Sequence, residues 1–396
     1  MTRLARPWFG LALPALLVSL LLLHVATASA ETLARCGRGW VERTDGSLVL
    51  HLAGSPYEMG YQHGALMREH VRENLRYLLE ERGTTPLKVG PIKVYPRAAI
   101  ETIAGYQQRH TAPRYQEEIA GIAAGAAVSE RDVRMCNFIP ELFHCSGFAL
   151  TGSATKDGHV LHGRVLDYKC DWHLQDHAVI VIAEPDDGIP LVNITYAGFI
   201  GSVTGMNARG ISIGEMGGGG FGHWDGTPMA LLVREALRTA RDLEGAIAVF
   251  RDTKRTCEYY YVVADGNTNR AVGLEASWNK FTVLATGQFH PLLTEPLRDT
   301  VLLSAGPRYR ELVRRAKAGH GGFDSASALR LMDRGVATKS NLHNVLFAPA
   351  TGDFWVAHAS SDGKPAAEQP YHAFNLGELL KRKPDEAAKE IPLPKK

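Results

Sequence analysis

The sequence CSGFALTGSATKDGHVLHGRVLDY (residues 145–168) marks the point where the pattern of the chain changes from helical to extended. Two strand-like runs flank a DG dipeptide, which favours a tight turn between antiparallel strands. Cys145 stands at the first position of this predicted hairpin, and Arg164 and Asp167 lie on its second strand. We therefore predict a β-hairpin that brings a thiol near one guanidinium and one carboxylate.

These three residue types can support nucleophilic chemistry. A free thiol has a pKa of about 8.5, so it needs a base or a nearby positive charge to become a thiolate. A guanidinium favours the thiolate, and a carboxylate can hold a guanidinium or an ammonium group in place. His144 directly precedes Cys145, but adjacent strand residues point to opposite faces, which argues against a Cys–His dyad. The spacing alone favours a different interpretation, a buried cysteine at a strand start with a surface ion pair.

Beyond the hairpin, runs of strand-like and helical pattern alternate in blocks. The predicted strands and helices are, in chain order, strands AVIVIAEP, LVNITYAGFI and ISIGEM, helices MALLVREALRTA and LEGAIAVFR, strands YYYVVAD, AVGLEA and FTVLAT, helices 307–318 and 324–334, and strands NVLFAP and FWVAHA. Sheet, helices and sheet within one chain predict two antiparallel sheets with helices on their outer faces. We expect an α+β protein whose four-layer αββα core covers residues 145–380.

The segment 31–144 is predicted to be mainly helical after one short strand at 47–52. Ser55 and Glu58 flank a proline in a capping-box pattern, which predicts the start of a helix that ends near Gly83. The last residues, 381–396, are rich in Lys, Glu and Pro, and this composition predicts a flexible tail.

The amino terminus has the order of a secretory signal. Arg3 and Arg6 precede an apolar run of about 15 residues, and Ala28-Ser29-Ala30 supplies small residues for cleavage after Ala30. The run is shorter than a bilayer span requires, so no stable membrane span is expected. We predict a signal peptide at 1–30 and a secreted or periplasmic protein.

Charge and cysteine content exclude several classes of function. Lys and Arg number 44 and Asp and Glu 42, and no basic tract points to nucleic acid. The five cysteines have no CxxC spacing, which argues against a zinc knuckle. His173 and His177 lack the acidic residue of an HExxH motif, and the run 217–220 lacks a phosphate-loop pattern, so neither a metal nor a bound phosphate is predicted. The other four cysteines are predicted to be either reduced and buried or paired in disulfides.

Residues 145–168 resemble the nucleophile hairpin of N-terminal-nucleophile amide hydrolases, as found in choloylglycine hydrolase and penicillin V acylase. The upstream sequence GSPYEMGYQHG resembles the entry motif of the self-cleaving isopenicillin N acyltransferase (acyl-CoA:6-aminopenicillanic acid acyltransferase) family. The resemblance implies cleavage between His144 and Cys145, so that Cys145 becomes both the nucleophile and the bearer of a basic α-amine. It also implies that no cofactor is needed.

The resemblance assigns further residues to the site. Arg164 and Asp167 match the family's R-x-x-D, and Arg308 matches the end of an S-x-x-x-R segment. Relatives commonly place an asparagine after the strand that corresponds to FTVLAT, where this chain has Gln288, so Gln288 or backbone N–H groups would supply the oxyanion hole. Asn207, in the family's N-x-x-G turn, is expected to be mainly structural.

The predicted function is therefore that of an exported, self-processing cysteine hydrolase or acyltransferase of linear amides. Its substrate is expected to be a small N-acyl amine or N-acyl amino acid. One alternative is a lipid amidase or phospholipase-B-like esterase on the same fold. Another, from a different class, is a secreted binding protein that has lost catalysis, which the replaced asparagine would favour.

Overall fold

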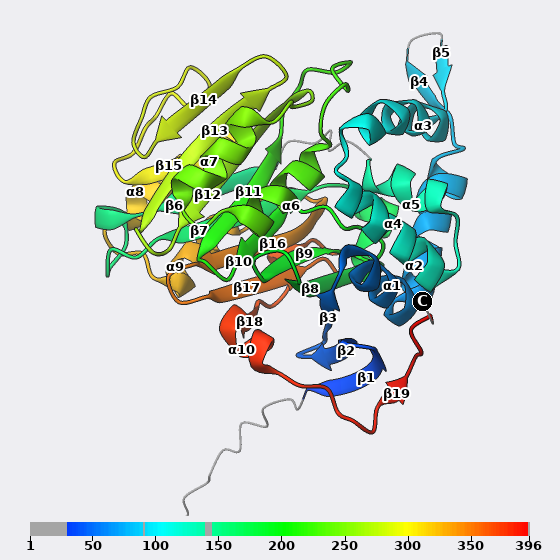
Figure 1. Cartoon of the computed structure of the whole chain (residues 1–396). Coiled ribbons are helices and arrows are strands. Elements are labelled where there is room, and N and C mark those ends of the chain that lie inside the picture. The colour runs from blue at the N-terminus through cyan, green and yellow to red at the C-terminus, as the bar shows by residue number, and fades with distance from the viewer. Residues whose placement is uncertain (1–29, 90–91, 139–144, 395–396) are drawn as a thin grey trace, which may run out of the picture.

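The hairpin that begins after Cys145 is present. The computed structural model describes residues 30–89, 92–138 and 145–394 (Figure 1). Strands β6 (Ser146–Leu150) and β7 (Leu161–Asp167) run antiparallel, with Ser146 opposite Val165. Gly158 of the DG dipeptide has a φ of +78°, a left-handed conformation that glycine adopts without strain. The predicted hairpin is confirmed, with a longer connection than a two-residue turn.

The hairpin belongs to a six-stranded sheet, and a second sheet has eleven strands. In spatial order the smaller sheet consists of β15 (Thr300–Leu303), β6, β7, β16 (Asn341–Ala348), β17 (Asp353–His358) and β18 (His372–Asn375). The larger sheet consists of β14 (Phe281–Ala285), β13 (Arg270–Ser277), β12 (Glu258–Asp265), β11 (Ile211–Gly217), β10 (Thr204–Asn207), β9 (Leu191–Tyr196), β8 (Ala178–Pro185), β3 (Ser47–Gly54), β2 (Gly39–Thr44), β1 (Glu31–Cys36) and β19 (Lys389–Glu390).

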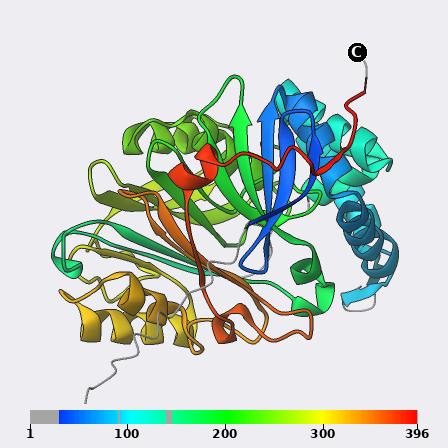
Figure 2. The same cartoon turned by 90° about the horizontal axis from the view of Figure 1, so that it is seen from below.

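Helices cover the outer faces of both sheets, and the four layers are visible in Figure 2. α6 (Met229–Thr239) and α7 (Leu243–Asp252) pack on the larger sheet, and α8 (Gly306–Gly319) and α9 (Ser325–Leu329) pack on the smaller one. Between the sheets lie buried apolar side chains such as Ile180 and Phe347. Burial of this apolar surface holds the layers together. The αββα sandwich is confirmed.

Residues 31–54 differ from the prediction, because three strands occur where the pattern indicated one. β1 and β2 continue the larger sheet, and β3 pairs in parallel with β8 of the core. Residues 31–54 therefore complete the same sheet as the hydrolase core. Farther along the chain, β4 (Leu87–Val89) and β5 (Ile92–Val94) form a short separate hairpin.

The described residues of this N-terminal segment also contain five α-helices, as the sequence pattern predicts; two precede the β4–β5 hairpin and three follow it. They are α1 (Pro56–Leu66), α2 (Arg68–Leu75), α3 (Pro96–Gln107), α4 (Pro113–Ala126) and α5 (Glu130–Asn137). The capping box at the start of α1 is present, since Ser55 and Glu58 bond each other's backbone N–H groups. The predicted helix to Gly83 is interrupted at Met67 and ends in a π-helical turn, Arg76–Arg82.

The C-terminal stretch makes more contacts than its composition predicts. After α10 (Leu376–Lys381), Arg382 forms an ion pair with the buried Glu42, and β19 pairs with β1. This contrasts with the flexible tail predicted for 381–396. Residues 1–29 of the predicted signal peptide (1–30) lie outside the described part of the chain. In the part that is described, no helix combines the length and apolarity needed to cross a bilayer.

Candidate active site

Cys145 lies at the start of the smaller sheet, in the wall of a cavity. Its side chain is buried, and its thiol donates to the backbone oxygen of Asp167 at 3.9 Å. The cavity has a volume of about 530 Å³ and opens between the two sheets, with Cys145 from one sheet and Met216 from the other in its wall. A buried thiol beside an open cavity is accessible to a small substrate.

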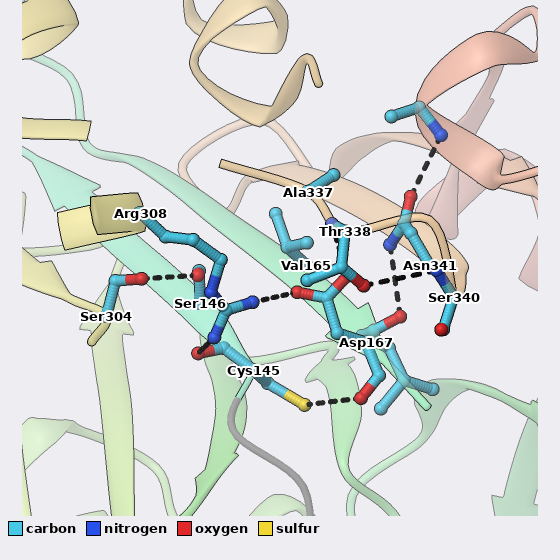
Figure 3. A network of polar contacts seen from close by, with 12 residues as sticks. Cys145, Ser146, Val165, Asp167, Ser304, Arg308, Ala337, Thr338, Ser340 and Asn341 are labelled. Carbon is cyan, nitrogen blue, oxygen red and sulfur yellow. Dashed lines mark hydrogen bonds and ion pairs between the residues drawn. The ribbon is translucent and has the colours of Figure 1, made fainter. Parts of the chain in front are cut away.

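Asp167 and Arg308 form an ion pair next to Cys145 (Figure 3). The second terminal nitrogen of Arg308 donates to the backbone oxygen of Cys145 at 3.2 Å. The other carboxylate oxygen of Asp167 accepts from the backbone N–H and the hydroxyl of Thr338, both at 2.9 Å. Burial raises the pKa of the Asp167 carboxyl, and Arg308 and Thr338 oppose that rise. The network fixes the backbone around the thiol.

The junction between β15 and α8 positions Arg308. Ser304 follows β15 and shares a hydrogen bond of 2.7 Å with Ser146, the residue after Cys145. α8 begins two residues later, and its first turn carries Arg308. The S-x-x-x-R segment therefore contacts the start of the hairpin at both of its ends, which brings Arg308 to Cys145 as the resemblance implied.

Arg164 forms its ion pair with Glu215, whereas Asp167 forms its ion pair with Arg308. Its guanidinium lies 3.5 Å from a carboxylate oxygen of Glu215, and both side chains are fully buried. It also donates to the backbone oxygen of Val165 at 2.6 Å. Sequence reasoning missed Glu215, although an acidic residue inside the apolar run ISIGEM was a usable signal, because a buried charge needs a partner. Thr338 was also missed, and its position in the sequence gave no signal.

The remaining wall of the cavity is mostly apolar. Its lining residues are Cys145, Met216, Gly217, Gly218, Gly219, Phe221, Glu258, Tyr260, Leu284, His290, Leu292, Leu293, Leu303, Ser304, Ala305 and Gly306. The glycine-rich run after β11 thus borders the cavity. An apolar cavity with few polar groups is the usual form of a small-molecule site.

Neither side chain considered for the oxyanion hole lines this cavity. Gln288 is exposed, and its side-chain oxygen accepts from the backbone N–H of Ala285 at 2.9 Å in the turn after β14. Asn207 is buried and bonds four backbone groups around the turn after β10 and the end of α6. Asn207 thus has the contacts of a structural residue.

The histidines and the other cysteines lie in separate surroundings. His173 contacts Asp176 at 3.0 Å, and His177 contacts His70 at 3.2 Å. Within the described ranges, no group of three or more His, Cys, Asp or Glu side chains could hold a metal ion. No disulfide joins the remaining cysteines, which are Cys36, Cys136, Cys170 and Cys257. His144 is outside the described residues.

The four-layer sandwich, with a cysteine at the start of a strand facing an apolar cavity, is the fold of an N-terminal-nucleophile hydrolase. Residues 153–286 match the model of the acyl-coenzyme A:6-aminopenicillanic acid acyl-transferase family. The resemblance to this family that the sequence showed is thereby confirmed for residues 153–286.

Individual relatives agree with this assignment. The 40 kDa form of acyl-coenzyme A:6-aminopenicillanic-acid-acyltransferase from Emericella nidulans is 26% identical over 58% of this chain and 64% of its own length. The N-acylethanolamine-hydrolyzing acid amidase of Oryctolagus cuniculus is 27% identical over 46% of this chain and 52% of its own. An uncharacterised protein of Archaeoglobus fulgidus is 28% identical over 71% of this chain. The chain spans 50% to 64% of the length of these and other curated relatives.

One solved structure matches part of this chain. The Caenorhabditis elegans N-acylethanolamine-hydrolyzing acid amidase ortholog has a TM-score of 0.45 and 16% identity, and the match covers 58% of this chain and 99% of that one.

Proposed function

We propose that this protein is an exported, self-processing cysteine hydrolase of linear amides, with Cys145 as its nucleophile. The observation that carries the proposal is the position of Cys145, whose thiol borders an apolar cavity while Arg308 and Asp167 hold its backbone. Enzymes that form acyl intermediates need such a nucleophile beside a substrate-sized cavity. Two of the curated relatives named above are an acyltransferase and an acid amidase, which supports this class of reaction.

Self-processing supplies the base. The Cys145 thiol attacks the carbonyl carbon of His144, and the acyl group moves from nitrogen to sulfur. Water then hydrolyses the thioester, so that His144 gains a free carboxylate and Cys145 a free α-amine. With an ordinary pKa of about 7.7–8, this amine takes the thiol proton at neutral pH.

The catalytic cycle then has two halves. Cys145 attacks the amide carbonyl of the substrate, and its α-amine passes the thiol proton to the leaving amine. Water, activated by the same amine, releases the acyl group and restores the thiol. Asp167 and Arg308 act as positioning residues here, because their contacts hold Asp167 in place and orient the backbone of Cys145.

The cavity and the compartment indicate the type of substrate. Leucine, methionine and phenylalanine side chains in the wall suit the acyl chain of an N-acyl amine or N-acyl amino acid. Transfer from acyl-CoA would need a donor that is scarce outside the cytoplasm, so hydrolysis is favoured for an exported protein.

The proposal is tested with a panel of N-acyl amines and N-acyl amino acids of graded chain length. We expect wild-type turnover, trapping of an acyl group on Cys145 at acidic quench, and no turnover by Cys145→Ala. Cys170→Ala is the control, because this half-buried cysteine does not line the cavity. Full activity in Cys145→Ala would refute the proposal.

A further inference from the structure

One charged side chain, Glu258, stands in the otherwise apolar wall of the Cys145 cavity. It lies at the start of β12, next to the glycine-rich run that borders the cavity. Tyr260, two residues later on the same strand face, also lines the cavity, and its hydroxyl donates to Glu258 Oε1 at 2.9 Å. Glu258 is the one Asp, Glu, Lys or Arg residue among the residues that line this cavity.

The partners of Glu258 differ from those of Glu275 on the neighbouring strand. Glu275 is bound by the ammonium of Lys280 at 2.8 Å and lies 3.5 Å from His290 Nε2. Glu258 accepts from one neutral hydroxyl, and no Lys or Arg of the described residues forms an ion pair with it. A carboxylate in a partly desolvated site is stabilised most by a charge-assisted hydrogen bond. Such a bond is what a cationic ligand would add.

We propose that Glu258 and Tyr260 form a subsite for a cationic group, and that the ligand of this cavity combines an apolar acyl chain with a protonated amine separate from the scissile amide nitrogen, as in an N-acyl diamine or an N-acyl basic amino acid. The claim that the substrate carries a cation rests on the proposed function, because the cavity then also holds the scissile amide. The claim that Glu258 and Tyr260 bind a cationic group does not depend on catalysis.

The cavity has an apolar part and a polar part. Met216, Leu284 and Leu303 offer apolar contact, and the Tyr260 hydroxyl fixes one oxygen of Glu258. Holding one oxygen leaves the carboxylate oriented for an ammonium group. A neutral or anionic ligand of equal size would leave Glu258 desolvated without compensation, so it should bind more weakly.

The test is calorimetric binding of octylammonium, octanol and octanoate to the wild-type protein at pH 7. None of these probes contains an amide, so binding is read without turnover. We expect octylammonium to bind roughly ten- to hundredfold more tightly than octanol, the range for a hydrogen bond to a charged group. Glu258→Gln keeps the tyrosine contact and removes the charge, and it should abolish this preference.

Two further variants sharpen the result. Glu244→Gln removes a charge from an exposed ion pair with Arg270, outside the cavity lining, and should retain the preference for octylammonium. Glu258→Lys should shift the preference to octanoate. Absence of octylammonium binding, equal affinities for the three probes, or an unchanged preference in Glu258→Gln would overturn the proposal.

The two proposals fail in different ways. If Cys145→Ala remains active while Glu258→Gln loses the octylammonium preference, the amidase proposal is wrong and the cationic subsite stands. If Cys145→Ala is inactive while Glu258→Gln keeps the octylammonium preference, the amidase proposal stands and the cationic subsite is wrong.

Discussion

At the scale of single residues, Asp167 links the most parts of the site. Its carboxylate bonds Arg308 from α8 and Thr338 from the segment before β16, while its backbone oxygen accepts from the Cys145 thiol. Its side chain is 5% exposed and that of Arg308 15%, so both charges are largely removed from water. If the charge of either residue is removed, the other remains buried without an opposite charge to offset the free-energy cost of its desolvation.

Asp167→Asn tests this role. Asparagine retains hydrogen bonding but loses the charge opposite Arg308, so we expect turnover to fall at least a hundredfold and stability to fall by about 1–3 kcal/mol. Turnover per folded molecule and urea unfolding measure the two effects. Asp252→Asn, at an exposed pair with Arg251, is the control and should change neither. Wild-type turnover in Asp167→Asn would contradict the role.

The sequence predicts part of this site for a clear reason. Cys145, Arg164 and Asp167 fall within one hairpin, so their proximity follows from local pairing, and Arg308 follows from the family motif. Glu215 and Thr338 come from strands and loops whose approach to the hairpin depends on how the two sheets pack. No local pattern carries that information.

At the scale of elements, α1 and α4 approach each other through glycines. A side chain on Gly60 would meet the backbone oxygen of Glu118 at 2.0 Å, and one on Gly121 would meet that of Tyr57 at 2.3 Å. Backbone atoms cannot move aside as a flexible side chain can. The spacing GxxxG, present in both helices, is what permits this contact.

Gly121→Ala is therefore expected to separate the two helices. Overpacking of this kind costs about 1–3 kcal/mol or more, so the urea midpoint should fall clearly. Gly105→Ala, in exposed α3 with nothing near its added carbon, should instead stabilise by about 0.5–1 kcal/mol. Equal midpoints for the two variants would contradict the glycine contact.

His63 couples α1 to the core in a pH-dependent way. Its Nε2 accepts from the backbone N–H of Gly198 at 2.9 Å, and burial lowers the pKa of His63 to about 3. Histidine in the unfolded chain has a pKa of about 6.5, so between about pH 6.5 and pH 3 the unfolded state binds a proton at His63 and the folded state does not. This contribution to stability is present above about pH 6.5 and is lost as pH falls toward 3.

His63→Gln tests the coupling, because glutamine can accept the same bond without titrating. Its unfolding free energy should fall less steeply than that of the wild type between pH 7 and pH 4. Urea unfolding at several pH values measures the slopes. Parallel curves for the two proteins would show that His63 does not contribute.

At the scale of the whole molecule, the segment before Cys145 and the core share one sheet. β3 lies between β2 and β8, so the larger sheet contains strands from both sides of the proposed cleavage point in the sequence (Figure 1). The sequence predicted the αββα layers, because their strands and helices have strong local patterns. It missed β1 and β2, which extend the sheet outward from β3, with β2 paired to β3 and β1 paired to β2.

This shared sheet predicts the behaviour of the processed protein. Fragments 31–144 and 145–396 should elute together in gel filtration and separate only in denaturant, since β3 and β8 remain paired through six residue pairs. Separate elution of the two fragments without denaturant would contradict this pairing.

The central claim is that Cys145 is a nucleophile released by self-cleavage. Intact mass spectrometry under denaturing conditions tests it most directly, on wild type and Cys145→Ala. The account predicts two chains in the active wild type, the second beginning at Cys145, and one uncut chain in the variant. A single uncut chain with full activity would contradict it.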